Sequence, residues 1–167
     1  MRADLHLHST YSDGKYTPDE ICKIAKSRGV SLLSITDHDT MLGLEDKQAS
    51  AKRNGLHFIN GWEISAYTES GIKTHILGYG CQIGDGYDAF IAARKAAAFA
   101  RAKESVAKCN EAGIPLTIEE VSAARLRDDI PVHTMHVARA LKKYVDGTDG
   151  EIYQNYLARG KLANSNI

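Results

Sequence analysis

The sequence predicts an α/β fold in the first half of the chain and a helical segment in the second. Strand-like and helix-like segments alternate through residues 1–82, which is typical of parallel strands joined by helices. The run VSLLSIT is apolar and of strand length, as expected for a parallel strand buried on both faces. After Gly80 an alanine-rich stretch begins, and its composition favours a long helix.

The first strand and the first helix have the clearest local signals. ADLHLH, residues 3–8, predicts a short strand. In TPDEICKIAKSRG, Thr17 is suited to the N-cap, Pro18 to the first helical position and Glu20 to a capping box. Gly29 is suited to end this helix.

The next segments predict a second helix and three more strands. VSLLSIT is the second strand, and DTMLGLEDKQASAKRNG predicts a helix that Asp39 or Thr40 caps and that ends near Gly55. LHFINGWEIS and KTHILGYG predict two further strands, with AYTESGI as the turn between them. This gives about four strands, fewer than a closed barrel requires. The sheet is therefore either open or completed by residues outside this sequence.

The second half of the chain predicts helices. YDAFIAARKAAAFARAKESVAKCNEAG favours one long helix, and TIEEVSAARL begins with another capping box, from Thr117 to Glu120. MHVARALKKYV and GEIYQNYLARG predict two further helices. We therefore expect two domains, residues 1–82 as the α/β part and residues 83–167 as a helical lobe.

Charge and composition narrow the classes of function. Lys and Arg number 21, as do Asp and Glu, so no global positive field exists to hold duplex nucleic acid stably. No apolar run approaches the ~20 residues that span a bilayer, and the N-terminus has no signal-peptide pattern. Cys22, Cys81 and Cys109 are far apart and are interpreted as small apolar residues rather than disulfide partners. These features predict a cytoplasmic protein that does not bind membranes.

His6 and His8 are two residues apart on the first predicted strand. Alternation of side chains places both on one face, ~6.7 Å apart along the strand, so the two imidazoles can converge on one metal ion. Asp4 shares this face and is a candidate to support a ligand. Taken alone, a histidine pair on a solvated strand face fits the spacing equally well.

Acidic and imidazole groups also follow the first two strands. Asp13, in YSDG, fits either an ordinary Asp-Gly turn or a ligand. In TDHD, Asp39 fits a helix cap, and Asp37 fits either a cap or a partner that orients His38. His38 has no evident structural role and is the stronger ligand candidate, because ligands collect at the C-terminal ends of strands in α/β folds.

Two further candidates lie in the later strands. Glu63 ends the third predicted strand, and His75 lies inside KTHILGYG. A histidine within an apolar strand is usually a core residue, and His57, at the start of a strand, is interpreted as structural. Each strand-like segment nevertheless supplies a His, Asp or Glu in or just after the strand, and this mixture suits Zn²⁺, Mn²⁺ or Fe²⁺. A bridging Glu63 can hold two ions together, the arrangement of many phosphoryl-transfer sites.

The segments DLHLHSTYSDGKYTPDE, SITDHDT, GWEIS and THILGYG together resemble the motifs of the PHP (polymerase and histidinol phosphatase) family. They are most similar to the branch that contains 5′-AMP and nucleoside 3′,5′-bisphosphate phosphatases and RNA-trimming exonucleases. The resemblance implies the N-terminal part of a distorted (β/α)₇ barrel, with residues 83–167 as a helical insertion lobe. It also implies two or three divalent ions, Mn, Zn or Fe, in the complete family site. By motif it assigns metal ligation to His6, His8, Asp13, His38, Glu63 and His75.

The same resemblance assigns Arg101 and His136 to substrate binding, because they match insertion positions that face the phosphate. A solvated helix charge explains Arg101 almost as well. Family members continue with further strands, a His-Pro element and a late Asp-x-His pair, which this sequence does not contain, and Thr134 stands where an arginine is usual. The resemblance therefore implies that a full three-ion site needs residues from outside this sequence.

The resulting prediction is a metal-dependent phosphoesterase that hydrolyses a phosphate ester of a nucleotide, short oligonucleotide or similar small substrate through a metal-bound hydroxide. One alternative is a PHP module that binds metal or a phosphate ligand without turnover. A second is an amidohydrolase-type metal hydrolase, which TDHDT and GWEIS fit poorly. The sequence contains no Gly-rich phosphate loop and no GxSxG elbow.

Overall fold

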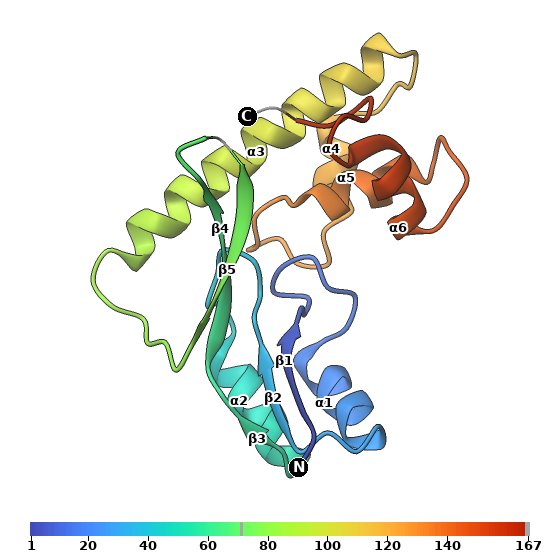
Figure 1. Cartoon of the computed structure of the whole chain (residues 1–167). Coiled ribbons are helices and arrows are strands. Elements are labelled where there is room, and N and C mark those ends of the chain that lie inside the picture. The colour runs from blue at the N-terminus through green and yellow to red at the C-terminus, as the bar shows by residue number, and fades with distance from the viewer. Residues whose placement is uncertain (71, 166–167) are drawn as a thin grey trace. The chain divides into compact units, whose positions relative to one another are not determined.

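The computed structural model describes residues 1–70 and 72–165. The chain forms two compact units, Met1–Ile91 and Ala92–Ile167. Strands and two helices build most of the first unit, whereas helices build the second (Figure 1). The prediction of a mixed α/β fold is therefore confirmed. Within the described ranges, no helix is both long enough and apolar enough to cross a membrane.

A three-stranded parallel sheet is the centre of the first unit. Strands β1 (Ala3–Leu7), β2 (Leu32–Ile35) and β3 (His57–Phe58) are hydrogen-bonded in that order. Helices α1 (Pro18–Ser27) and α2 (Leu44–Arg53) pack against one another beside the sheet (Figure 1). The apolar core between these elements consists of Ile21, Cys22, Ala25, Val30, Leu33, Ile35 and Ala51.

Strands β4 (Gly61–Tyr67) and β5 (Lys73–Tyr79) form an antiparallel hairpin. The prediction of one continuous strand over LHFINGWEIS is wrong, because this segment divides into β3, which pairs with β2, and β4, which pairs with β5. The predicted turn AYTESGI is also too long, since Ala66 and Tyr67 still belong to β4; its Gly71 lies outside the described residues. The Tyr79 hydroxyl donates to the Leu5 carbonyl at 2.9 Å, which joins β5 to β1.

The start of α1 is as predicted, but the start of α2 is not. Thr17 accepts a hydrogen bond from the Glu20 backbone, and the Glu20 side chain reaches back to Thr17, which completes the capping box. Helix α2 begins after Gly43, whose φ of 70° is left-handed, and no side chain caps it. Asp39, with φ 52°, instead accepts from the backbone N–H of Ser65 on β4 at 2.8 Å. The Asp39 carboxylate, which was a predicted cap of the helix, thus accepts a hydrogen bond from a distant strand instead.

The second unit is helical. Its elements are α3, which begins in the first unit, then α4, α5, α6 and the π-helical turn η1, with bounds Tyr87–Glu111, Ile118–Ala123, Thr134–Leu141, Asp149–Ile152 and Tyr153–Leu157. The predicted capping box from Thr117 to Glu120 is confirmed at α4. Helix α5 ends earlier than MHVARALKKYV predicts, and the predicted helix over GEIYQNYLARG divides into α6 and η1. The assignment of residues 83–167 to an insertion lobe stays a prediction.

The cysteines are free thiols. Cys22 is fully buried in the core of the first unit and Cys109 in that of the second, while Cys81 is half-buried. Burial raises the pKa of the Cys22 thiol to about 11 and also raises the pKa of Cys109. The interpretation of Cys22 and Cys109 as small apolar core residues is confirmed.

Candidate metal centre

A backbone bridge places His38 and Glu63 side by side. The segment after β2 pairs with β4 in parallel fashion at these two residues. The N–H of Asp39 donates to the Glu63 carbonyl at 2.7 Å, and the N–H of Glu63 donates to the Asp37 carbonyl at 3.2 Å. Main-chain hydrogen bonds therefore fix the position of His38 relative to Glu63.

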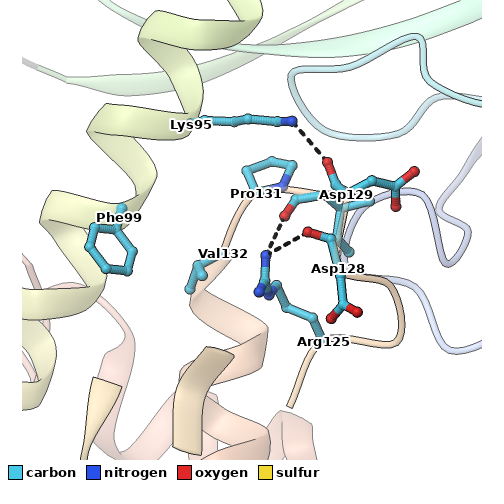
Figure 2. A pocket seen from close by; sticks show the side chains of 8 residues that line it. Lys95, Phe99, Arg125, Asp128, Asp129, Pro131 and Val132 are labelled. Carbon is cyan, nitrogen blue, oxygen red and sulfur yellow. Dashed lines mark hydrogen bonds between the residues drawn. The ribbon is translucent and has the colours of Figure 1, made fainter. Parts of the chain in front are cut away.

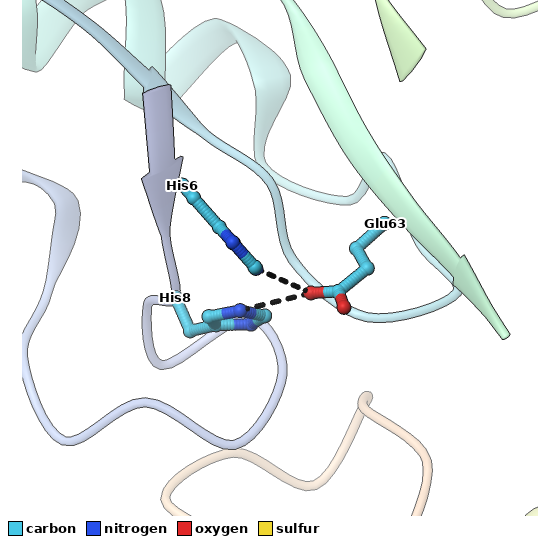
Figure 3. Close-up of side chains that lie close together, drawn as sticks. All are labelled: His6, His8 and Glu63. Carbon is cyan, nitrogen blue, oxygen red and sulfur yellow. Dashed lines mark hydrogen bonds and ion pairs between the residues drawn. The ribbon is translucent and has the colours of Figure 1, made fainter. Parts of the chain in front are cut away.

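Glu63 is the centre of the cluster and is only 2% exposed. Its Oε2 atom lies 2.9 Å from Nε2 of His6 and 3.0 Å from Nε2 of His8 (Figure 3). The two histidines project toward the carboxylate from β1 and from the residue directly after it (Figure 3). The predicted convergence of this histidine pair is therefore present in the structure.

The register of β1 against β2 shifts between Asp4 and Leu7. Such an irregularity interrupts the strict alternation of faces and often lies beside functional sites. For this reason the face of Asp4 does not follow from that of His6 and His8, and Asp4 belongs to none of the candidate ligand groups found among the described residues. Its supporting role stays a prediction.

Two more imidazoles reach the same carboxylate. His38 Nδ1 lies 3.5 Å from Glu63 Oε2, and His75 Nδ1 lies 2.6 Å from Glu63 Oε1. Asp13, in the loop after β1, approaches Nδ1 of His8 with its Oδ1 at 3.6 Å. All six predicted ligands are thus brought together.

Within the described part of the chain, three groups have ligand atoms that all lie within 4.8 Å of one another. They are His6, His8 and Glu63; His8, Asp13 and His38; and His38, Glu63 and His75. The first and third groups share Glu63, but no histidine belongs to both of them. This sharing is what a carboxylate that bridges two ions requires.

The protonation states favour metal binding. Burial lowers the pKa of His38, so its ring is neutral near pH 7 and offers a lone pair. Burial raises the pKa of Glu63, but the electrostatic interaction with His38 and the hydrogen bond with His6 outweigh this effect and hold the pKa below its usual value. The donor set is therefore a carboxylate among imidazoles, a combination that suits Zn²⁺, Mn²⁺ and Fe²⁺.

Asp37 supports this centre through contacts with residues beside the proposed ligands. The sequence predicted only part of this role, namely a cap or a partner of His38. It is fully buried, forms an ion pair with Lys47 of α2 and accepts hydrogen bonds from Ser9 and Ser12. Burial raises its pKa, but the Lys47 charge and these hydrogen bonds outweigh burial and lower it. Lys47 gave no sequence signal, because a lysine in a charged helix is normally solvated.

The two predicted substrate residues lie in the second unit. Arg101 is half-buried on α3, and His136 is fully buried at the start of α5, where its Nδ1 accepts from the backbone N–H of His133 at 2.9 Å. Their contact with phosphate stays a prediction. His57, interpreted as structural, is exposed on β3 and lies in none of the three groups formed by described residues.

A surface cavity of about 340 Å³ lies in the second unit (Figure 2). Lys95 donates to the Asp129 carbonyl at 2.8 Å, and Arg125 donates to the carbonyls of Asp128 and Ile130 (Figure 2). These cations therefore hold the backbone of the 128–130 loop. The cations that line this cavity therefore serve the structure of the loop, and the lining is not that of a metal site.

The fold and the ligand cluster together define an α/β protein whose strand ends gather the donor set of a metallohydrolase. The comparison with family models agrees, since the PHP domain model matches residues 4–160. The chain belongs to the PHP family.

Two of the relatives are named for activities on RNA or on a nucleoside bisphosphate. The chain is 36% identical over 162 residues to a 5′-3′ exoribonuclease of Haemophilus influenzae, a match that covers 96% of this chain and 58% of the relative. It is 44% identical over 77 residues to a 3′,5′-nucleoside bisphosphate phosphatase of Chromobacterium violaceum, covering 46% of this chain and 27% of the relative. The chain thus spans little more than half the length of the exoribonuclease.

Solved structures show the same fold. One from Chromobacterium violaceum, described as an amidohydrolase with bound sulfate and no metal, has a TM-score of 0.85 at 30% identity and covers 98% of this chain and 57% of its own. Another, from Bifidobacterium adolescentis and described as a metal-dependent phosphoesterase, has a TM-score of 0.86 at 23% identity, with 98% and 58% covered. The second similarity is evidence for the fold alone.

Proposed function

We propose that the protein is a metal-dependent phosphoesterase that hydrolyses a phosphate monoester or diester of a nucleotide, short oligonucleotide or similar small substrate. The observation that carries this proposal is the convergence of four imidazoles and the Asp13 carboxylate around the buried Glu63 carboxylate. Buried ionisable groups are costly unless they are paired or bind metal, and so many donors at one point suit metal binding. In this proposal the α/β unit is the N-terminal part of a distorted (β/α)₇ barrel.

The ligand groups fit two ions better than three. A neutral imidazole offers one lone pair, so each histidine serves one ion. The two groups that share only Glu63, namely His6 with His8 and His38 with His75, would each hold one ion and leave Asp13 as a further donor. Divalent ions bound there would lower the pKa of a water molecule and neutralise charge on phosphoryl oxygens.

The ligands of the chain set the charge of the centre. The histidines bind as neutral rings, and the two carboxylates, Asp13 and Glu63, contribute two negative charges against about four positive charges for two divalent ions. The loaded centre therefore keeps a net positive charge. A positive centre attracts a phosphate dianion and stabilises the charge that builds on its oxygens during displacement.

Relatives support the substrate class. An exoribonuclease, a nucleoside bisphosphate phosphatase and a phosphoribosyl cyclic phosphate diphosphodiesterase of Eggerthella lenta, which is 45% identical over 85 residues, all cleave phosphate esters of nucleotide-like compounds. The related structure from Chromobacterium violaceum binds sulfate, a tetrahedral oxyanion with the shape of phosphate. We further propose that Arg101 and His136 contact the substrate phosphate.

The test is phosphate release by the purified chain in the presence of Mn²⁺. Substrates are 5′-AMP, a nucleoside 3′,5′-bisphosphate and a short oligoribonucleotide. We expect turnover that a Glu63→Gln variant loses by at least about 100-fold. A Glu69→Gln variant, with an exposed carboxylate on the same hairpin, is expected to keep it. If the chain binds Mn²⁺ but cleaves none of the substrates, the phosphoesterase proposal fails and the protein is a binding module.

A further inference from the structure

Lys47 is among the largest fully buried side chains in the described part of the molecule, with 1% exposure. Its Nζ lies 2.6 Å from Oδ2 of Asp37, which is itself 0% exposed. Lys47 comes from α2, and Asp37 directly precedes His38 in the segment that follows β2. A buried ion pair therefore connects a helix to the residue beside a proposed metal ligand.

The Asp37 carboxylate also holds the loop that follows β1. Its Oδ1 accepts from the Ser9 N–H at 2.7 Å and from the Ser12 hydroxyl at 2.6 Å, and its Oδ2 accepts from the Ser9 hydroxyl at 2.7 Å. Ser9 follows His8 and Ser12 precedes Asp13. One carboxylate therefore fixes both ends of the loop between two of the proposed ligands, in addition to its place beside His38.

Helix α2 closes over the same loop. The Lys47 Nζ lies 5.6 Å from the centre of the Tyr11 ring, and the Tyr11 hydroxyl donates to Asp46 at 3.3 Å. A Cβ on Gly43 would lie 2.1 Å from the Tyr11 ring, so the start of α2 admits this ring only because residue 43 is glycine. The loop is thus in contact both with α2 and with the Asp37 carboxylate.

Stability alone does not explain this arrangement. Removing two charges from water is costly, and well-packed apolar residues are often as stabilising as a buried ion pair. What the ion pair adds is direction, because the ammonium fixes the carboxylate and the carboxylate orients three donors of the loop. As a result, the Asp37–Lys47 pair holds the backbone next to His8, Asp13 and His38 in place.

We propose that Lys47 is a positioning residue of the metal centre, which acts through Asp37 to hold His8, Asp13 and His38 in place for metal binding. This inference rests on the proposed function only in that the cluster binds divalent ions. Partners that orient metal ligands typically change metal affinity by about 10- to 100-fold when they are lost.

The experiment is Mn²⁺ titration by calorimetry on the full chain, without any activity assay. Lys47→Met removes the ammonium and keeps a long apolar side chain, while Lys52→Met changes an exposed lysine of the same helix. Melting temperatures in chelator establish that each variant is folded. We expect Lys47→Met to weaken Mn²⁺ binding by about 10- to 100-fold and Lys52→Met to bind as the wild type does.

A double variant, Asp37→Asn with Lys47→Met, is measured beside the single one because it leaves no unpaired charge in the core. We expect it to melt close to the wild type yet still bind Mn²⁺ at least about tenfold more weakly, which a role in stability alone would not produce. Wild-type affinity in either folded variant overturns the role of Lys47 and leaves the proposed function intact. Failure of the wild-type chain to bind Mn²⁺ overturns both.

Discussion

Oε1 of Glu63 lies 2.6 Å from Nδ1 of His75, although the two residues are diagonal rather than direct partners across the β4–β5 hairpin. Glu63 pairs with Leu77, and His75 pairs with Ser65. Residues two apart on a strand share a face, so the hairpin register itself brings the carboxylate and the imidazole to the same side. His75 is a candidate ligand only of the ion that His38 and Glu63 would hold, and not of the ion that His6, His8 and Glu63 would hold.

That asymmetry predicts different losses for two substitutions. His75→Ala removes a ligand from one group, so we expect weaker binding of one Mn²⁺ ion and little change in the other. Glu63→Gln removes the shared carboxylate and should weaken both. Calorimetric titration with metal analysis measures the stoichiometry, with His57→Ala as the control on exposed β3. Equal losses in the two site variants would contradict the bridging role of Glu63.

Metal should stabilise the folded chain. An ion that binds only the native state at about 100 times its dissociation constant adds about 2.7 kcal/mol. For a chain of this size that corresponds to a rise of roughly 5–10 °C in melting temperature. Thermal melts with and without Mn²⁺ measure it, and EDTA should reverse the shift. An unchanged melting curve at millimolar Mn²⁺ would show that the folded chain has no preformed site.

Gly14 and Gly150 predict opposite effects of the same substitution. A Cβ at Gly14 would lie 2.2 Å from the His8 carbonyl oxygen, whereas a Cβ at Gly150, in α6, meets nothing within 4 Å. We expect Gly14→Ala to lower the free energy of unfolding by at least about 2 kcal/mol. Gly150→Ala should raise it by about 0.5–1 kcal/mol. Urea denaturation measures both, and a neutral Gly14→Ala variant would show that the loop can move away.

Glu120 should make the second unit sensitive to acid. Hydrogen bonds from the side chains of Lys143 and Tyr144 lower the pKa of its carboxyl from 4.5 to about 2. Because the folded pKa lies below the unfolded value, the ionised group stabilises the fold above pH ~4.5, and this contribution is lost as the pH falls toward 2. A Glu120→Gln variant should therefore be less stable than the wild type at pH 7.

The measurement is urea denaturation at a series of pH values, followed by helical circular dichroism. The difference between the wild type and Glu120→Gln should shrink as the pH falls from about 5 to about 2. Glu119→Gln, a change at the exposed neighbouring carboxylate, is the control. A difference that does not depend on pH would mean that the hydrogen bonds act without the charge.

Local chemistry predicted those parts of the fold that depend on neighbouring residues. The capping boxes at Thr17 and Thr117 each use a partner three residues away, so a short sequence window contains the whole interaction. The convergence of the six proposed ligands was predictable mainly from the family motifs, which define which residues take part, because these residues come from two different sheets.

Features with distant partners could not be predicted in this way. Asp39 does not cap α2 because Ser65, 26 residues later, takes its carboxylate. The division of LHFINGWEIS into two strands depends on which neighbours β3 and β4 find. Lys47 resembles any surface lysine in the sequence, and only its burial against Asp37 distinguishes it. In each case a tertiary contact overrides the local preference.

The unequal burial of the three cysteines has a practical use. At neutral pH the Cys22 thiol, with a pKa of about 11, stays protonated and shielded, and Cys109 is fully enclosed. A maleimide dye should therefore attach first at Cys81, two residues after the end of β5, the strand that carries His75. The native chain thus offers an attachment point for a fluorescent reporter just after β5 without any engineered cysteine.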